Sequence, residues 1–149
     1  MSQSKPINLG LLPELIGYHL HRAEIVSYRD FVKRFHNPKY TPKQFSVLVL
    51  AGANPGTSQV AIGNALGMDR ATTMNVINKL EARKLLKRER STRDRRKHEI
   101  HLTEKGLALT ERLAAHSRAH EDKLTTNLTS REAATLRKLL MKVRSTMED

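Results

Sequence analysis

The chain contains no cysteine, which excludes disulfide bridges, thiolate metal sites and thiol-based redox sensing. Long apolar runs are also missing: FSVLVLAGA at 45–53 is far shorter than the ~20 residues that a membrane span needs. The first ten residues, MSQSKPINLG, lack the charged-then-apolar layout of a secretory signal. At 149 residues the chain fits one domain of ordinary size. We therefore expect a cytoplasmic protein with no membrane segment.

Positive charge, by contrast, is in excess. Lys and Arg number 27 against 15 Asp and Glu, which gives a net charge of +12. A protein this basic is expected to bind a polyanion, with nucleic acid the first candidate and an acidic membrane surface the second. The charge is densest in STRDRRKHEIHLTEKG at 91–106, where three arginines and Lys97 surround Asp94. A merely solvated loop would mix both signs, so this segment predicts contact with DNA.

Helical patterns occupy the N-terminal part of the sequence. From Leu11 to about Phe35, apolar residues recur at steps of three and four on two faces, which is typical of a helix with more than one neighbour, as in a dimer. TPKQ at 41–44 has the form of a capping box with proline at the first helical position, and predicts a second helix that ends near Ala53.

The middle of the chain predicts a winged helix. A helix beginning at Thr57 or Ser58 should end at Gly67, and the next should begin after Asp69 as its cap, which is the spacing of a helix-turn-helix. LLKRERS at 85–91 and KHEIHL at 97–102 then bracket the basic turn, and the second alternates apolar and polar residues as a half-buried strand does. Two long helices should follow, one capped by Thr103 and one by a Thr129–Glu132 capping box.

The second helix of the helix-turn-helix offers a face suited to reading bases. Thr73, Val76, Ile77 and Leu80 fall on one side of a helical wheel and should face the core. The opposite side is small and amide-rich; asparagine can pair with adenine, arginine with guanine, and a methyl group can contact thymine. The side chains that we predict to contact DNA are Ser58, Arg70, Ala71, Thr72, Asn75, Asn78, Lys79, Arg88, Arg90, Arg93, Arg95, Arg96 and Lys97, whereas Asp94 should pair with a neighbouring arginine and fix the turn.

The segment GNALGMDRATTMNVINKLEARKLLKRERSTRDRRKHEIHLTEKG at 63–106 resembles the core of the MarR (multiple antibiotic resistance regulator) family of bacterial transcription factors. RDRRKHEIHLTEKG is similar to that family's wing signature, an arginine-rich turn leading to Leu-Thr-x-x-Gly. Two positions depart from the pattern: Ser91 stands where members often have Asp, and Lys84 where a glycine commonly ends the recognition helix. A lysine in a left-handed cap costs roughly 1 kcal/mol, so the helix could end differently here.

The resemblance implies a fold and an activity. The fold is mainly α with a small β-hairpin wing: residues 37–102 form a winged helix-turn-helix lobe for DNA, and 1–36 with 103–149 form a helical dimerisation region. A homodimer would bind a pseudo-palindromic operator with half-sites about 10 bp apart. The family's usual activity is repression of nearby genes, relieved when a small molecule enters the cleft between lobe and dimer base.

Candidate ligand sites are less sharply defined. An effector cleft could be lined by Tyr18, His19, Arg22, Tyr28 and Phe45, which would suit an aromatic or phenolic acid or its thioester, although the aromatic residues could equally be plain core. His116 and His120 lie four apart on one helix face, but two nitrogens without a third ligand make a weak metal site. We therefore expect no metal and no tightly held cofactor.

Two other classes of function fit the sequence poorly. It has no nucleophile elbow, glycine-rich phosphate loop or acid pair at catalytic spacing, so we expect no enzyme. A small RNA-binding or architectural nucleoid-type protein would also be basic, but it should place aromatic residues among the basic ones to stack bases. Aromatic residues make up only 4% here, and most lie far from the basic turn. The sequence therefore favours a sequence-specific, ligand-responsive repressor.

Overall fold

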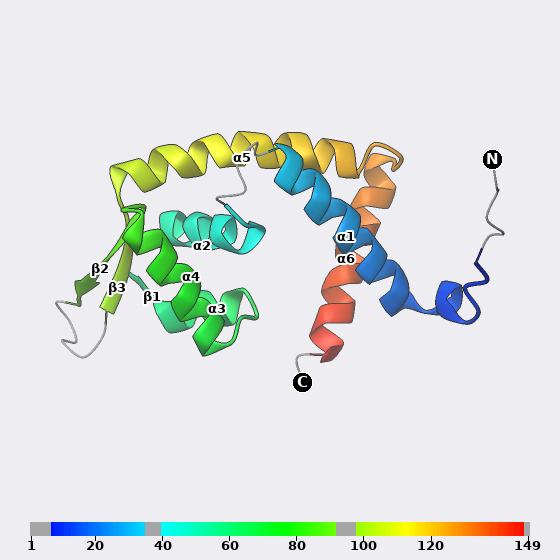
Figure 1. Ribbon diagram of the computed structural model, residues 1–149, viewed down its shortest axis with the longest axis horizontal. Helices are drawn as coiled ribbons and strands as arrows, with labels where there is room; N and C mark the ends of the chain where they lie inside the picture. Colours follow the sequence, from blue (N-terminus) through cyan, green and yellow to red (C-terminus); the bar gives the residue numbers. More distant parts are fainter. Residues whose placement is uncertain (1–6, 35–39, 92–97, 148–149) are drawn as a thin grey trace.

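The computed structural model describes residues 7–34, 40–91 and 98–147. In Figure 1, helix α5 (Glu104–Leu124) runs along the top from a winged-helix lobe on the left to α1 (Ile16–Arg34) and α6 (Ser130–Met147) on the right. The lobe consists of α2 (Pro42–Ala53), β1 (Thr57–Ser58), α3 (Gln59–Ala65), α4 (Arg70–Ala82), β2 (Leu86–Arg90) and β3 (His98–Leu102). This is the mainly helical winged-helix fold that the sequence predicts.

Local signals set most of the helix ends. The predicted capping box at Thr41 is present: its hydroxyl accepts from the Gln44 N–H at 3.2 Å, and the Gln44 side chain accepts from the Thr41 N–H at 3.0 Å. The turn between α3 and α4 contains Gly67 at φ +60°, a conformation that favours glycine. Gly63 lets the two helices cross closely, because a Cβ there would lie 2.7 Å from the Thr73 hydroxyl.

The sheet is antiparallel, with strand order β1-β3-β2. Leu86 of β2 pairs with Leu102 of β3, and Arg90 pairs with His98 at the end where the wing turn begins. Strand β1, in which Thr57 pairs with Ile100, is not predicted from the sequence. A strand of two residues has no periodicity to detect, and it forms only because β3 offers it an edge.

The lobe has a hydrophobic core of its own, to which every one of its helices contributes. Two residues of α5, Leu109 and Leu113, also belong to it, so the first half of α5 is packed into the lobe. The buried core residues are Val47, Leu48, Ala51, Ile62, Val76, Ile77, Leu80, Leu85, Leu86, Ile100, Leu109 and Leu113.

The N-terminal helix begins later than the sequence predicts. Residues Leu12–Glu14 form one 3-10 turn with Pro13 in it, and α1 starts only at Ile16, because Leu15 between them is extended at φ −94°, ψ 121°. The His19 ring hydrogen-bonds to the Pro13 carbonyl at 2.9 Å, which holds the turn against the helix. The apolar periodicity continues through the break, so periodicity alone predicts a start at Leu11.

The helices outside the lobe expose much of their apolar surface. On α6, Leu136, Leu139, Leu140, Met141 and Val143 are between 40% and 63% exposed in the isolated protomer. Similar exposure is found at Leu12, Leu15, Ile16 and Leu20 at the other end of the chain. A contiguous apolar surface of this kind normally marks an interface between proteins. In the described residues, no helix combines the length and the apolar character that a membrane span needs.

Candidate nucleic-acid interface

The N-terminus of α4 is fixed by its cap. The Asp69 carboxylate accepts from the Thr72 hydroxyl at 2.6 Å and from the Thr72 N–H at 2.8 Å. These hydrogen bonds hold the pKa of the Asp69 carboxyl below its ordinary value, and the one from the Thr72 hydroxyl has the larger effect. The carboxylate is therefore charged at neutral pH, where it also complements the positive end of the helix dipole.

The two faces of α4 divide as the helical wheel predicts. Thr73, Val76, Ile77 and Leu80 are buried, with Ile77 and Leu80 fully enclosed. The predicted base-reading side is open to solvent apart from a half-buried Thr72: Arg70, Ala71, Met74, Asn75, Asn78 and Lys79 are exposed. Short side chains dominate this face, so the helix backbone could approach the floor of a major groove.

Ser58 has a local task in the fold. It is the N-cap of α3, and its hydroxyl accepts from the Ala61 N–H at 3.1 Å. Since the side chain is also half-buried, a DNA contact by Ser58 would have to share the hydroxyl with this cap.

Only the base of the wing lies within the described residues. Arg90 is exposed at the end of β2. Ser91 is buried directly after it. The predicted contacts Arg93, Arg95, Arg96 and Lys97, and the turn-fixing Asp94, lie outside the described residues.

One side of the wing carries a pair of opposed acids. Glu89 of β2 lies directly across from Glu99 of β3, an arrangement of like charges that destabilises a strand pair. Lys87 offsets it: its ammonium lies 2.6 Å from the Glu89 carboxylate and, by hydrogen bond and charge, lowers the pKa of Glu89. Lys87 therefore adds less to the positive field of the wing than its charge suggests.

Arg88 does not point into solvent as a free cation. Its guanidinium forms an ion pair with Glu81 of α4, donates to Asn78 Oδ1 at 2.7 Å, and reaches Gln59 Oε1 of α3 at 3.3 Å. The Arg88 N–H also donates to Glu81 at 3.2 Å. This network is not predicted from the sequence, although the alternation of β2 places Arg88 on the same face as buried Leu86.

The C-terminus of α4 ends in the left-handed conformation, despite its lysine. Lys84 has φ +59°, the only positive φ at a non-glycine residue in the described part of the chain. The Leu85 N–H donates to the Leu80 carbonyl and the Lys84 N–H to that of Glu81, which is the Schellman pattern. Buried Leu80 and Leu85 supply its hydrophobic contact, so the tertiary packing offsets the strain at Lys84.

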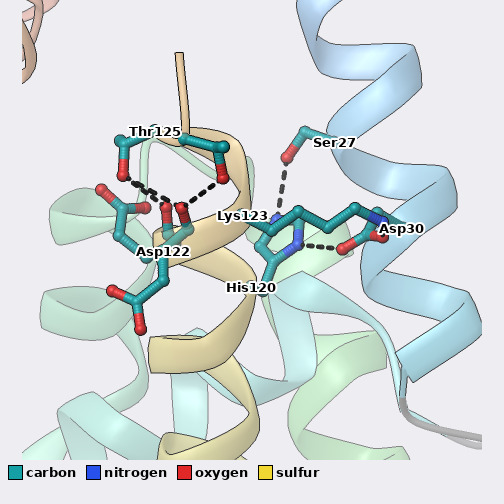
Figure 2. A network of polar contacts seen from close by, with 8 residues as sticks. Ser27, Asp30, His120, Asp122, Lys123 and Thr125 are labelled. Carbon is teal, nitrogen blue, oxygen red and sulfur yellow. Dashed lines mark hydrogen bonds and ion pairs between the residues drawn. The ribbon is translucent and has the colours of Figure 1, made fainter. Parts of the chain in front are cut away.

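A polar cluster joins α1 to α5. Figure 2 shows His120 between Ser27 and Asp30, with its Nδ1 at 2.8 Å from Asp30 Oδ2 and its Nε2 at 3.1 Å from the Ser27 hydroxyl. Lys123 forms an ion pair with the other oxygen of Asp30, and Phe31 packs its ring edge-on to His120. His120 is therefore engaged in holding two helices together, and in the described residues no three His, Asp or Glu side chains gather as a metal site.

The five residues predicted for an effector cleft are distributed over different surroundings. His19 lines a largely apolar groove of about 1040 Å³ between α1, the end of α5 and α6, and it is the only one of the five that does so. Tyr18 packs edge-on against His19, with ring centres 5.4 Å apart. Arg22 and Tyr28 are exposed, while Phe45 packs against the lobe core.

Known proteins of similar sequence and structure share this architecture. A sequence description of the MarR family matches residues 39–97. A protein assigned to regulation of the hcr operon in Thauera aromatica is 30% identical over 86% of this chain and 78% of its own length. The solved structure of the transcriptional repressor CouR on a 23-mer DNA duplex is 38% identical, with a TM-score of 0.87 over 94% of this chain and 99% of that one. CouR bound to p-coumaroyl-CoA is 36% identical, with a TM-score of 0.85 over 93% and 98%.

These likenesses span the lobe and the outer helices together, so they concern the whole architecture rather than the helix-turn-helix alone. MarR-type regulators bind DNA as homodimers, and the RNA-binding alternative is not favoured. The winged lobe, the recognition helix and the near full-length matches together place this chain in the MarR family, as a DNA-binding transcription regulator.

Proposed function

We propose that this protein is a repressor in which α4 reads the bases of a pseudo-palindromic operator while the wing holds the adjacent backbone. The observation that carries the proposal is the contact between Arg88 of β2 and Asn78 on the exposed side of α4. It ties the base of the wing to the edge of the reading face, so both surfaces can meet one duplex. Such a regulator would act in the cytoplasm and by binding alone, without catalysis.

The proposed division of labour follows from side-chain chemistry. Arg70, Thr72 and Asn75 on α4 can reach base edges, where arginine suits guanine and asparagine suits adenine. The arginines of the wing, with Arg90 at its base, are suited to phosphates and to a narrow minor groove. Phosphate contacts position the protein and make its affinity dependent on salt, whereas base contacts specify the sequence.

Residues 1–36 and 103–149 would form the dimer base. The exposed apolar side chains on α1 and α6, and the apolar groove between them, support this, because a second copy would cover them. Two lobes held on one base would reach successive major grooves, with half-sites about one helical turn, or 10 bp, apart.

We propose further that an aromatic or phenolic acid, or its thioester, is the effector. The support is the p-coumaroyl-CoA that the similar CouR binds, together with Tyr18, His19 and Arg22 on one stretch of α1. Thermal unfolding should be measured with phenolic acids and acyl-CoA thioesters, and DNA binding with each one that stabilises the protein. An effector should stabilise the free protein and lower its affinity for DNA; a panel without such a compound would count against this ligand class.

The DNA-binding proposal is tested by the salt dependence of binding. Arg95→Ala should weaken binding to every duplex and reduce the slope of log K against log salt concentration by about 0.9 for each phosphate that the protein no longer neutralises. Fluorescence anisotropy at several salt concentrations measures this slope. An unchanged affinity and slope would remove the wing from the interface.

A further inference from the structure

The amide of Asn78 is held by a charged partner, and the amide of Asn75 is not. Both lie on the exposed face of α4, three residues apart. Arg88 donates to Asn78 Oδ1 at 2.7 Å, within the range of a charge-assisted hydrogen bond. Within the described residues, no hydrogen-bond partner is found for the side chain of Asn75.

The orientation of the Asn78 amide follows from its partner. A guanidinium has only N–H donors, so the side of the amide that faces Arg88 must be the carbonyl oxygen. Since the amide group is planar, its NH₂ then points away from Arg88. The amide of Asn78 is therefore fixed in one of its two orientations, whereas that of Asn75 can turn to suit a base.

Arg88 itself is fixed by more than Asn78. Its side chain is only 21% exposed, and it is anchored on Glu81 through both its guanidinium and its backbone N–H. The guanidinium also contacts Gln59, in the first turn of α3. A guanidinium that already contacts three side chains on α3 and α4 has few donors left for a phosphate.

Resting on the proposed reading of bases by α4, we propose that Arg88 is a positioning residue: it holds Asn78 so that this side chain offers hydrogen-bond donors to the DNA. A donor without a paired acceptor can bind guanine (N7 or O6), thymine (O4) or adenine (N7), but it cannot accept from the N6 amino group that distinguishes adenine. Asn78 then does not make the two-ended contact with adenine that the sequence alone suggests. Asn75 keeps that capacity.

The test uses the full-length protein and a pool of randomised duplexes, whose bound fraction is sequenced after selection. The variants are Arg88→Met, Arg88→Lys and the matched control Arg90→Met, which removes an exposed arginine two residues further along the same strand. For each, the salt slope of binding to the unselected pool is measured as well. Circular dichroism establishes which variants are folded.

Arg88→Met frees the oxygen of Asn78, so the amide can contact both N6 and N7 of adenine, and the preference for adenine at one base pair in each half-site should rise. The shift is expected to reach roughly 5- to 150-fold, the range for one bidentate base contact. The salt slope should stay at the wild-type value. Arg90→Met should do the opposite, leaving the base preference unchanged and lowering the slope by about 0.9 for each phosphate that Arg90 neutralises in the wild type.

Arg88→Lys decides between geometry and charge. Lysine keeps the charge but lacks the planar fork, and its ammonium should pair with Glu81 rather than reach Asn78. The lysine variant should therefore shift the base preference as the methionine variant does. If lysine restores the wild-type preference, or if Arg88→Met lowers the salt slope as Arg90→Met does and leaves the preference alone, the positioning role is wrong.

Asn78→Asp provides a route that does not disturb Arg88, because aspartate still pairs with the guanidinium but has no donor to offer. It should lose the contact with base acceptors at that base pair and favour cytosine, whose N4 amino group is a donor; a base preference equal to that of the wild type would contradict the inference. The outcome also separates two kinds of failure. If Arg90→Met and Asn75→Ala affect DNA binding as proposed and only the Arg88 and Asn78 variants do not, this inference fails alone; if none of them affects it, the proposed function fails.

Discussion

A Cβ atom on Gly106 would lie 1.8 Å from the carbonyl oxygen of Leu85. The first turn of α5 is thus pressed against the backbone that follows the recognition helix. Thr103 adds two hydrogen bonds to this contact. Its N–H donates to the Leu85 carbonyl at 3.1 Å, and its hydroxyl donates to the Lys84 carbonyl at 2.7 Å. The glycine of the Leu-Thr-x-x-Gly motif is therefore required by close contact, and it couples α5 to the end of α4.

Gly106→Ala should accordingly destabilise the protein by at least about 2 kcal/mol, because the added methyl group meets backbone that cannot move without displacing Leu85 from the core. Chemical denaturation monitored by circular dichroism measures the free energy of unfolding. Ala108→Ser, at an exposed position in the same part of α5, should change it by less than about 0.5 kcal/mol. A Gly106→Ala protein as stable as the wild type would disprove the close contact.

Lys84→Gly should stabilise the protein by up to about 1 kcal/mol. Lys84 holds a left-handed conformation at φ +59° that glycine adopts without steric strain. Lys84→Ala is the matched control, because it removes the side chain but keeps the Cβ that causes the strain. Equal stability of the glycine and alanine variants in urea denaturation would show that the left-handed conformation at position 84 does not strain the protein.

The stability of α4 should depend on pH through Asp69. Its folded-state pKa is lowered, first by the hydroxyl of Thr72 and then by its N–H. The charged carboxylate therefore adds stability above its unfolded-state pKa, and this stability is lost as pH falls through the lower, folded-state value. An asparagine at the same position could also cap the helix but does not titrate in this range.

The wild type should thus exceed Asp69→Asn in melting temperature at neutral pH, and the difference should shrink as the carboxylate is protonated. Melting temperatures of both proteins, measured at equal concentration across acidic pH, test this. A difference that stays constant with pH would mean that the charge of Asp69 contributes nothing.

Leu139→Glu should separate the dimer into monomers. Leu139 is 52% exposed on the apolar side of α6, so a charge there leaves the protomer intact but cannot be buried against a partner. Ala115→Glu, at an exposed position on α5, should remain dimeric. Light scattering gives the mass directly, and deletion of residues 131–149 should give the same result as Leu139→Glu. A dimeric deletion variant would move the interface away from α6.

The sequence predicts the parts of this fold that local chemistry decides. The cap at Asp69, the capping box at Thr41 and the inward face of α4 are all read correctly, because each depends on residues within one or two helical turns. The strand at Thr57 is not predicted because it forms only against β3, and the break at Leu15 is not predicted because the apolar periodicity runs through it.

The same distinction separates the parts of the candidate site. The exposed, amide-rich face of α4 follows from periodicity alone. In the sequence, Arg88 cannot be told from the other basic residues of the wing. Its partners Gln59, Asn78 and Glu81 lie on two other elements of the lobe, so only the folded structure brings them together. Composition could suggest an effector cleft, but it could not show that Phe45 belongs to the lobe core while His19 faces a groove beside α6.

The most direct test of base reading by α4 compares Asn75→Ala with the wild type on two duplexes, one selected from a random pool by the wild type and one of unrelated sequence. Anisotropy titrations of both proteins at one salt concentration give the four affinities. The account predicts a loss of about 1–3 kcal/mol on the selected duplex and a clearly smaller loss on the unrelated one. Equal losses on the two duplexes would contradict it.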